Sequence, residues 1–203
     1  MSSRSQSIDS RILRSIRARK GASAFSAKDF AHLGNAVAIG QALARLAKRD
    51  ELRRIRQGIY DLPRPHPLLG QTAPDPMAVI RALMDGSGAQ WQASGAYAAN
   101  LLGLSEQVPA KIVILTDGVP RRVPLGKLTL VFRRAAPRNL LGAGKPAGLV
   151  IQAIRHLRKT GLSPAMVDQL RRQLDADTKA DLRTLAADVA AWMQPIVRQI
   201  AEG

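Results

Sequence analysis

Side chains that can read nucleic-acid bases occur close together between residues 35 and 56. Gln41 and Arg45 are four residues apart, so a helix would present both on one face. A glutamine amide can form two hydrogen bonds with adenine, and an arginine guanidinium can do the same with guanine. We therefore predict that Gln41 and Arg45 read bases in a major groove, with Asn35 as the next candidate. The alternative for Asn35 is that it serves only as a helix N-cap.

Basic side chains follow this pair, and their charge suits the phosphate backbone of a nucleic acid. The predicted backbone contacts are Lys48, Arg49, Arg53, Arg54 and Arg56. The alternative is that these side chains form an ordinary solvated surface.

The residues before and within this segment predict two short helices that would position these side chains. Ser26 is a candidate N-cap, and Asp29 stands where a capping box places its acid. Gly34-Asn35 breaks the first helix, because both residues tolerate a left-handed backbone. Ile39, Leu43 and Leu46 then repeat at helical spacing, which predicts a second helix over residues 36–49. The alternative is a short helix pair of the kind found in many all-α proteins.

A β-hairpin is predicted directly after the second helix. The period changes at residues 52–56, and Gln57-Gly58 leads into residues 59–62, with Gly58 supplying the positive φ of a hairpin tip. A helix over residues 8–20 and a short strand at residues 24–25 precede the helix pair. Together these elements predict a winged helix-turn-helix domain over residues 1–63, with the 36–49 helix in the major groove and the hairpin on the backbone.

Two segments resemble a known family. FSAKDFAHLG and ALARLAKRDELRRIRQGIYDLP look like the start of AbiEi-type antitoxins and transcriptional regulators, and Arg54, Gly58, Tyr60 and Pro63 match that branch's R-x-x-x-G-x-Y-x-x-P ending. SGAYAANLLGLSEQVPAKIVILTDG also resembles the branch, so the likeness covers roughly residues 8 to 155. The resemblance implies an autorepressor on operator repeats. It also implies an antitoxin that opposes a nucleotidyltransferase-like toxin, often without a stable complex.

The basic charge of the chain is concentrated near the predicted DNA-binding segment. The formal net charge is +16, which favours a polyanionic partner. Residues 1–64 hold 14 Lys and Arg against 5 Asp and Glu, whereas residues 148–203 hold 8 against 6. There is no cysteine, no apolar run long enough for a membrane span and no apolar signal region, so we expect a cytoplasmic protein. A homodimer is expected because operators are usually two-fold.

Beyond residue 63, the sequence predicts a linker and a second domain, which makes the whole chain α+β. Prolines predict a stiff linker at residues 64–74. The α+β domain at 75–203 should hold a small antiparallel sheet and C-terminal helices. Its predicted strands are residues 91–93, 111–116, 119–123 and 127–134, with Asp117-Gly118 as a hairpin turn. Its predicted helices begin at Asp75-Pro76, Ser94, Ala147, Ser163-Pro164 and Thr178, and the last runs to Ile200.

Four arginines of this domain carry a second open question. Arg121, Arg122, Arg133 and Arg134 could add to a nucleic-acid surface, or they could be edge charges that discourage strand pairing.

No pattern in the chain points to catalysis, a cofactor or a metal. The three histidines have no ligand spacing, and Gly142, Gly144 and Lys145 lack the rest of a phosphate-binding loop. Two functions remain. The first is a DNA-binding autorepressor that acts as an antitoxin, and the second is a basic interaction module that binds RNA or a protein without an operator.

Overall fold

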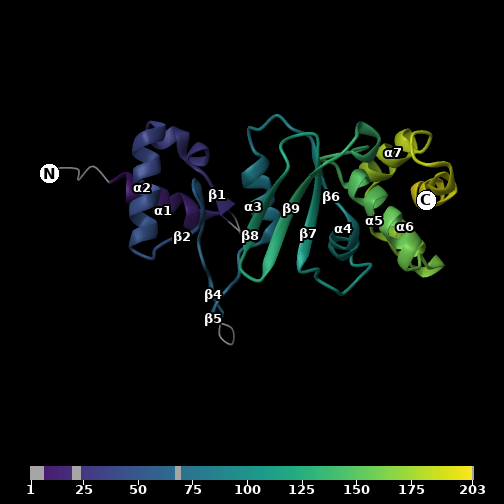
Figure 1. Cartoon of the computed structure of the whole chain (residues 1–203), viewed down its shortest axis with the longest axis horizontal. Coiled ribbons are helices and arrows are strands. Elements are labelled where there is room, and N and C mark those ends of the chain that lie inside the picture. The colour runs from purple at the N-terminus through teal and green to yellow at the C-terminus, as the bar shows by residue number, and fades with distance from the viewer. Residues whose placement is uncertain (1–6, 20–23, 67–69, 203) are drawn as a thin grey trace. The chain divides into compact units, whose positions relative to one another are not determined.

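The computed structural model describes residues 7–19, 24–66 and 70–202, and the chain divides into two compact units, Met1–Gly86 and Ser87–Gly203 (Figure 1). Helices and strands occur in both units, so the α+β class predicted from the sequence is confirmed. Residues 1–6, 20–23, 67–69 and 203 lie outside this description, and they include the last residue of the predicted 8–20 helix and part of the predicted 64–74 linker. None of the helices that it includes is long and apolar enough to cross a bilayer.

Three short helices open unit 1, and the sequence explains where they begin. Helix α1 (Ile8–Ala18) is followed by η1 (Ala27–Leu33), which is a 3-10 helix, and then by α2 (Ala36–Lys48). The Asp29 carboxylate accepts the backbone N–H of Ser26 at 2.8 Å, as a capping box requires. Helix α2 begins at the predicted residue and ends one residue before the predicted end.

The buried sides of these helices form the core of unit 1. Its members are Ile12, Leu13, Ile16, Phe25, Phe30, Ile39, Ala42, Leu43, Leu46, Leu52 and Tyr60. Helix α1 packs on this core, since it contacts both η1 and α2. Complete burial of one such Leu or Ile side chain contributes about 1.5–3 kcal/mol.

A small antiparallel sheet completes the predicted helix and hairpin segment. Strands β1 (Ala24–Phe25), β2 (Arg53–Arg56) and β3 (Ile59–Asp61) lie in the order β1-β3-β2. The predicted hairpin joins β2 to β3, and Gly58 at its tip has a φ of 80°. Because most residues rarely adopt this φ, glycine suits the turn.

The proline-containing segment after β3 has structure of its own. Strands β4 (Pro65–His66) and β5 (Gly70–Gln71) pair within the predicted 64–74 linker. Helix α3 (Pro76–Met84) begins as predicted, with Asp75 as its N-cap and proline in its first turn. The sequence places this helix in the second domain, whereas it contacts β1 and β3 of unit 1, so the structural boundary falls after residue 86.

The sheet of unit 2 is mixed, and the prediction of an antiparallel sheet is wrong. Its strands are β6 (Trp91–Ala93), β7 (Lys111–Thr116), β8 (Arg121–Leu125) and β9 (Leu128–Arg134), in the order β6-β7-β9-β8. Strand β9 pairs with β7 in parallel and with β8 in antiparallel register. Strand β8 is therefore an edge strand, where Pro124 is tolerated because proline cannot donate to a sheet ladder.

The Asp117-Gly118 hairpin is wrong for the same reason, because β9 lies between β7 and β8. Side-chain hydrogen bonds hold this turn instead of a strand ladder. The Asp117 carboxylate accepts the N–H of Gln90 at 2.9 Å, and Thr116 Oγ1 accepts the N–H of Gly118 at 3.0 Å. The chain consequently leaves β7 without pairing back onto it.

The C-terminal helices of unit 2 lie close to one another (Figure 1), and they share one hydrophobic core. They are α5 (Pro146–Thr160), α6 (Pro164–Gln173), α7 (Ala176–Leu185) and α8 (Gln194–Ala201), and α5 also contacts α4 (Gly95–Leu101). The prediction of one helix over residues 178–200 is wrong. The helix ends at Leu185, a 3-10 turn η3 (Ala191–Met193) follows, and Pro195 lies in the first turn of α8. This break lets α8 contact both α6 and α7.

Candidate nucleic-acid interface

One face of α2 is exposed along its whole length. Val37, Gln41, Ala44 and Lys48 are exposed, at a spacing that places them on one side of the helix. We call these four residues the α2 stripe. It lies opposite the buried residues of the helix, so the periodicity that builds the core also presents Gln41 outward. Val37 is 70% exposed, although an apolar side chain gives no sign in the sequence of a binding role.

Asn35 is the N-cap of α2. Its side-chain oxygen accepts the backbone N–H of Ala38 at 2.8 Å, which satisfies one of the free donors of the first helical turn. The structure therefore shows the capping role that the sequence left open, while base contact by Asn35 stays a prediction.

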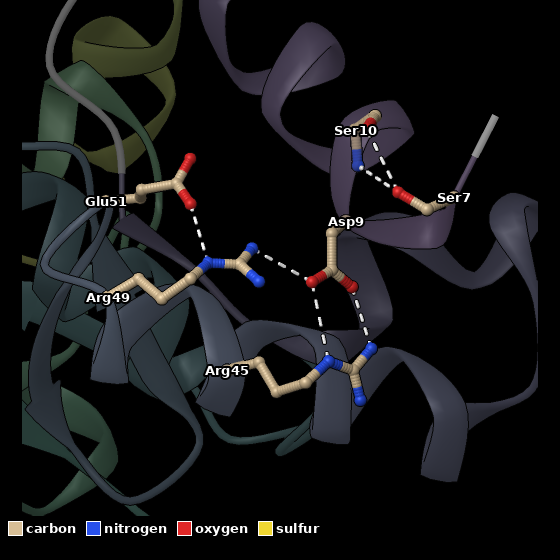
Figure 2. Close-up of polar contacts among 6 residues, drawn as sticks. All are labelled: Ser7, Asp9, Ser10, Arg45, Arg49 and Glu51. Carbon is tan, nitrogen blue, oxygen red and sulfur yellow. Dashed lines mark hydrogen bonds and ion pairs between the residues drawn. The ribbon is translucent and has the colours of Figure 1, made fainter.

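Arg45 and Arg49 share one carboxylate, and Figure 2 shows Asp9 of α1 between them. Arg45 donates to Asp9 through Nη2 at 2.7 Å and through Nε at 3.4 Å. Arg49 donates to Asp9 at 3.0 Å and to Glu51 at 2.8 Å. The four side chains form a small ionic cluster that connects α1 with the end of α2, and we call it the Asp9 cluster.

Hydrogen bonding within the Asp9 cluster favours the charged forms. The bond from Arg45 is the largest influence that lowers the pKa of Asp9; partial burial opposes it and the bond from Arg49 adds to it. The pKa of Arg45 is raised by its bond to Asp9, and the pKa of Arg49 is raised by its bonds to Glu51 and Asp9. Both arginine side chains remain about half exposed, at 53% and 50%, so solvent screens these ion pairs.

The Asp9 cluster predicts a pH-dependent contribution to stability. Because the pKa of Asp9 is lower in the folded state, its contribution is present above the unfolded-state pKa of about 3.9 and is lost as the pH falls through the folded-state pKa. Urea unfolding of the wild type and of Asp9→Asn should therefore differ at pH 7, and the difference should shrink below about pH 3.9. A difference that stays constant down to the acid limit would contradict an ionised Asp9 in the folded state.

The arginines of the hairpin fall into two groups. Arg53 is partly buried and donates to both carboxylate oxygens of buried Asp61, and through Nη1 to the Thr72 carbonyl oxygen at 2.8 Å. Arg53 therefore links the hairpin to the chain after β5. Arg54 and Arg56 are exposed on the same strand, and within the described residues neither forms a salt bridge.

The predicted site residues thus come together only in part. Gln41, Lys48, Arg54 and Arg56 are exposed, Arg45 and Arg49 belong to the Asp9 cluster, and Arg53 is part of an internal ion pair. Sequence reasoning missed Asp9, which lies 36 positions before Arg45. Only the three-dimensional packing of α1 on α2 brings the two together.

The described residues contain no cluster of three or more His, Asp or Glu side chains that could hold a metal ion. The predictions of no metal and no catalysis stay predictions.

Comparisons with known proteins give a family but no function. No curated protein matches the chain. A crystal structure of the RV2827C protein from Mycobacterium tuberculosis is similar at a TM-score of 0.42 and 16% identity, over 98% of this chain and 80% of that one. That likeness is too low to carry an argument. A family of unknown function, DUF6088, matches residues 11–182, and the chain belongs to this family.

Proposed function

We propose that this protein is a DNA-binding transcriptional autorepressor and that its N-terminal segment is a winged helix-turn-helix. The observation that carries the proposal is the α2 stripe, an exposed helix face on which Gln41 lies between the short side chains of Val37 and Ala44. Short side chains beside Gln41 would allow the helix to approach the floor of a major groove closely. Gln41 would then be in reach of a base edge.

The order of the elements supports the proposal. A helix, a short strand, two further helices and a hairpin follow one another, and the sheet order β1-β3-β2 places the hairpin against the first strand. Winged helix-turn-helix domains use the last of the three helices for recognition and the hairpin as the wing. In this chain those elements are α2 and the β2–β3 hairpin.

The charges around α2 also suit a DNA duplex. Lys48, Arg54 and Arg56 are exposed cations that could bind phosphates on either side of the groove. The Asp9 cluster holds Arg45 and Arg49 in fixed positions at the end of α2. Asp9 already accepts two hydrogen bonds from Arg45 and one from Arg49, so we assign both arginines to backbone contacts ahead of the base contact predicted for Arg45.

A gel shift and a footprint on the protein's own upstream region, compared with random DNA across a salt series, test the proposal. Protected inverted repeats with a clear preference over random DNA are the expected result, and they would also indicate the two-fold dimer. Binding that is sensitive to salt but blind to sequence would contradict an operator. The alternative, a basic module that binds RNA or a protein partner, would then take precedence.

Arg54→Ala is expected to weaken binding to all duplexes alike and to reduce the salt slope by about one unit, because one phosphate contact is lost. Arg81→Ala is the matched control, since Arg81 is an exposed arginine on α3 and its removal changes the net charge equally. Equal slopes for the two variants would show that Arg54 acts through bulk charge and contacts no phosphate.

The antitoxin role is a further part of the proposal, and the resemblance to AbiEi-type regulators is its support. Co-expression with the product of any neighbouring nucleotidyltransferase gene tests it. Rescue of growth is expected even without a stable complex between the two proteins. Undiminished toxicity at verified expression of both proteins would exclude the antitoxin role and leave the repressor role intact.

A further inference from the structure

Four arginines meet at one end of the sheet in unit 2. Arg121 and Arg122 begin β8, while Arg133 and Arg134 end β9, the strand that pairs with it. In the antiparallel register Arg121 lies opposite Phe132. The four residues are therefore near neighbours, and together with Pro120, Val131 and Phe132 they line a shallow hollow. We call them the sheet-end arginines.

The strand alternation distributes these arginines over both faces of the sheet. Arg122 and Arg133 project from one face, and Arg121 and Arg134 belong to the other. The guanidinium of Arg121 lies 4.6 Å from the centre of the Phe132 ring, so this arginine packs against the sheet. Arg122, Arg133 and Arg134 are exposed.

Few negative charges are present to balance this end of the sheet. Residues 111–138 contain seven Lys and Arg and one acidic residue, Asp117, whose carboxylate accepts a backbone N–H. Within the part of the chain that the structure describes, Arg122, Arg133 and Arg134 form no salt bridge. Their positive charges are therefore not offset by a carboxylate within the described residues.

Protection of the sheet edge does not account for all four arginines. Charges on β8 can discourage edge pairing, because β8 is an edge strand. Arg133 and Arg134 pair with β7 and extend past the start of β8, so only their other side is an open edge. One charge is enough to discourage pairing on such a short edge, whereas three exposed arginines with no salt bridge to any described residue gather here.

We propose that the exposed sheet-end arginines, Arg122, Arg133 and Arg134, bind the phosphate backbone of double-stranded DNA. Their charge selects a polyanion, and the surroundings select a duplex over a single strand. Proteins that bind single strands stack the bases on exposed aromatic rings. The one aromatic ring among the hollow's lining residues, Phe132, is 2% exposed and lies against Arg121. Phosphates, which need only cations, remain available to such a surface. This surface belongs to unit 2 and does not depend on the proposed role of α2.

The test compares two triple variants of the full chain that remove equal charge. Arg122→Gln/Arg133→Gln/Arg134→Gln removes the exposed sheet-end arginines. Arg171→Gln/Arg172→Gln/Arg198→Gln removes three exposed arginines from α6 and α8. Filter binding to a random DNA duplex and to a single-stranded RNA of the same length is measured across a salt series.

The sheet-end variant is expected to flatten the duplex salt slope by up to about three units, because each phosphate contact contributes about 0.9. The control variant should keep the wild-type slope. Equal loss in both variants, or no loss in either, would overturn the proposal. A loss confined to the RNA would replace the duplex with a single-stranded partner and would overturn it as well.

Arg122→Lys/Arg133→Lys/Arg134→Lys is the control for misfolding. It keeps the positive charges at the same positions, so it should keep most of the duplex salt slope. If it loses the slope while its circular dichroism spectrum is unchanged, a charge-based contact with phosphate is excluded. The outcome is separable from that of the α2 proposal. The Arg54→Ala slope and the footprint report on unit 1, whereas these variants leave unit 1 untouched.

Discussion

Leu43→Ala is expected to lower the free energy of unfolding by about 2–5 kcal/mol. Leu43 is 1% exposed and belongs to the core formed by α1, η1 and α2, so alanine would leave a cavity that these short helices cannot easily close. Urea unfolding followed by far-ultraviolet circular dichroism measures the loss. At the upper end of this range the loss approaches the whole stability of a small domain, so the variant should also lose DNA binding.

Val37→Ala is the matched control for this effect. It lies on the same helix and also removes aliphatic carbon, but it is 70% exposed. Its unfolding free energy should change by no more than about 0.5 kcal/mol. Similar losses for the two variants would mean that the buried and exposed faces of α2 are assigned wrongly, and the α2 stripe with them.

Gln41→Ala is expected to reduce the preference for the operator over random DNA by about 1–3 kcal/mol, which is the usual contribution of a two-bond contact with a base. Gln41 lies at the centre of the α2 stripe, and its side chain forms no hydrogen bond within the described residues. Competition gel shifts with operator and random duplexes measure the change. Binding to random DNA should stay nearly constant, because an amide contributes little to a phosphate contact.

Two comparisons sharpen this result. Gln199→Ala makes the same change at an exposed position of α8 and should leave the preference intact. Arg45→Ala should weaken operator and random binding alike. The change removes a proposed phosphate contact, and it leaves the negative charge of Asp9 with one arginine partner fewer. Loss of preference in Arg45→Ala, with none in Gln41→Ala, would reverse the roles assigned to the two residues.

Local patterns were enough to predict most helices and strands. The spacing of Ile39, Leu43 and Leu46 gave the helix and its buried face, and Gly58 marked the hairpin tip. These features depend on residues a few positions apart, which is the distance over which helix and strand periodicity can be recognised in a sequence.

Pairings between distant residues could not be predicted in the same way. Nothing in residues 111–134 indicates that the third strand of this run inserts between the first two, since parallel pairing depends on the whole domain. The Asp9 cluster likewise joins positions 9, 45 and 49. Apolar residues continue at helical spacing past Leu185, so the sequence alone predicts one long helix. The helix ends there because α7 and α8 both pack on the shared core of unit 2.

The two units carry different natural chromophores. The two tryptophans, Trp91 in β6 and Trp192 in η3, both belong to unit 2, and Trp192 lies beneath the guanidinium of Arg158 at 4.5 Å. Unit 1 contains Tyr60 but no tryptophan. Fluorescence excited at the red edge of the indole band therefore reports the melting of unit 2 alone. Circular dichroism follows both units. The part of its transition that the fluorescence trace does not account for therefore reports the unfolding of unit 1 in the unaltered full-length chain, without cutting it or attaching a dye.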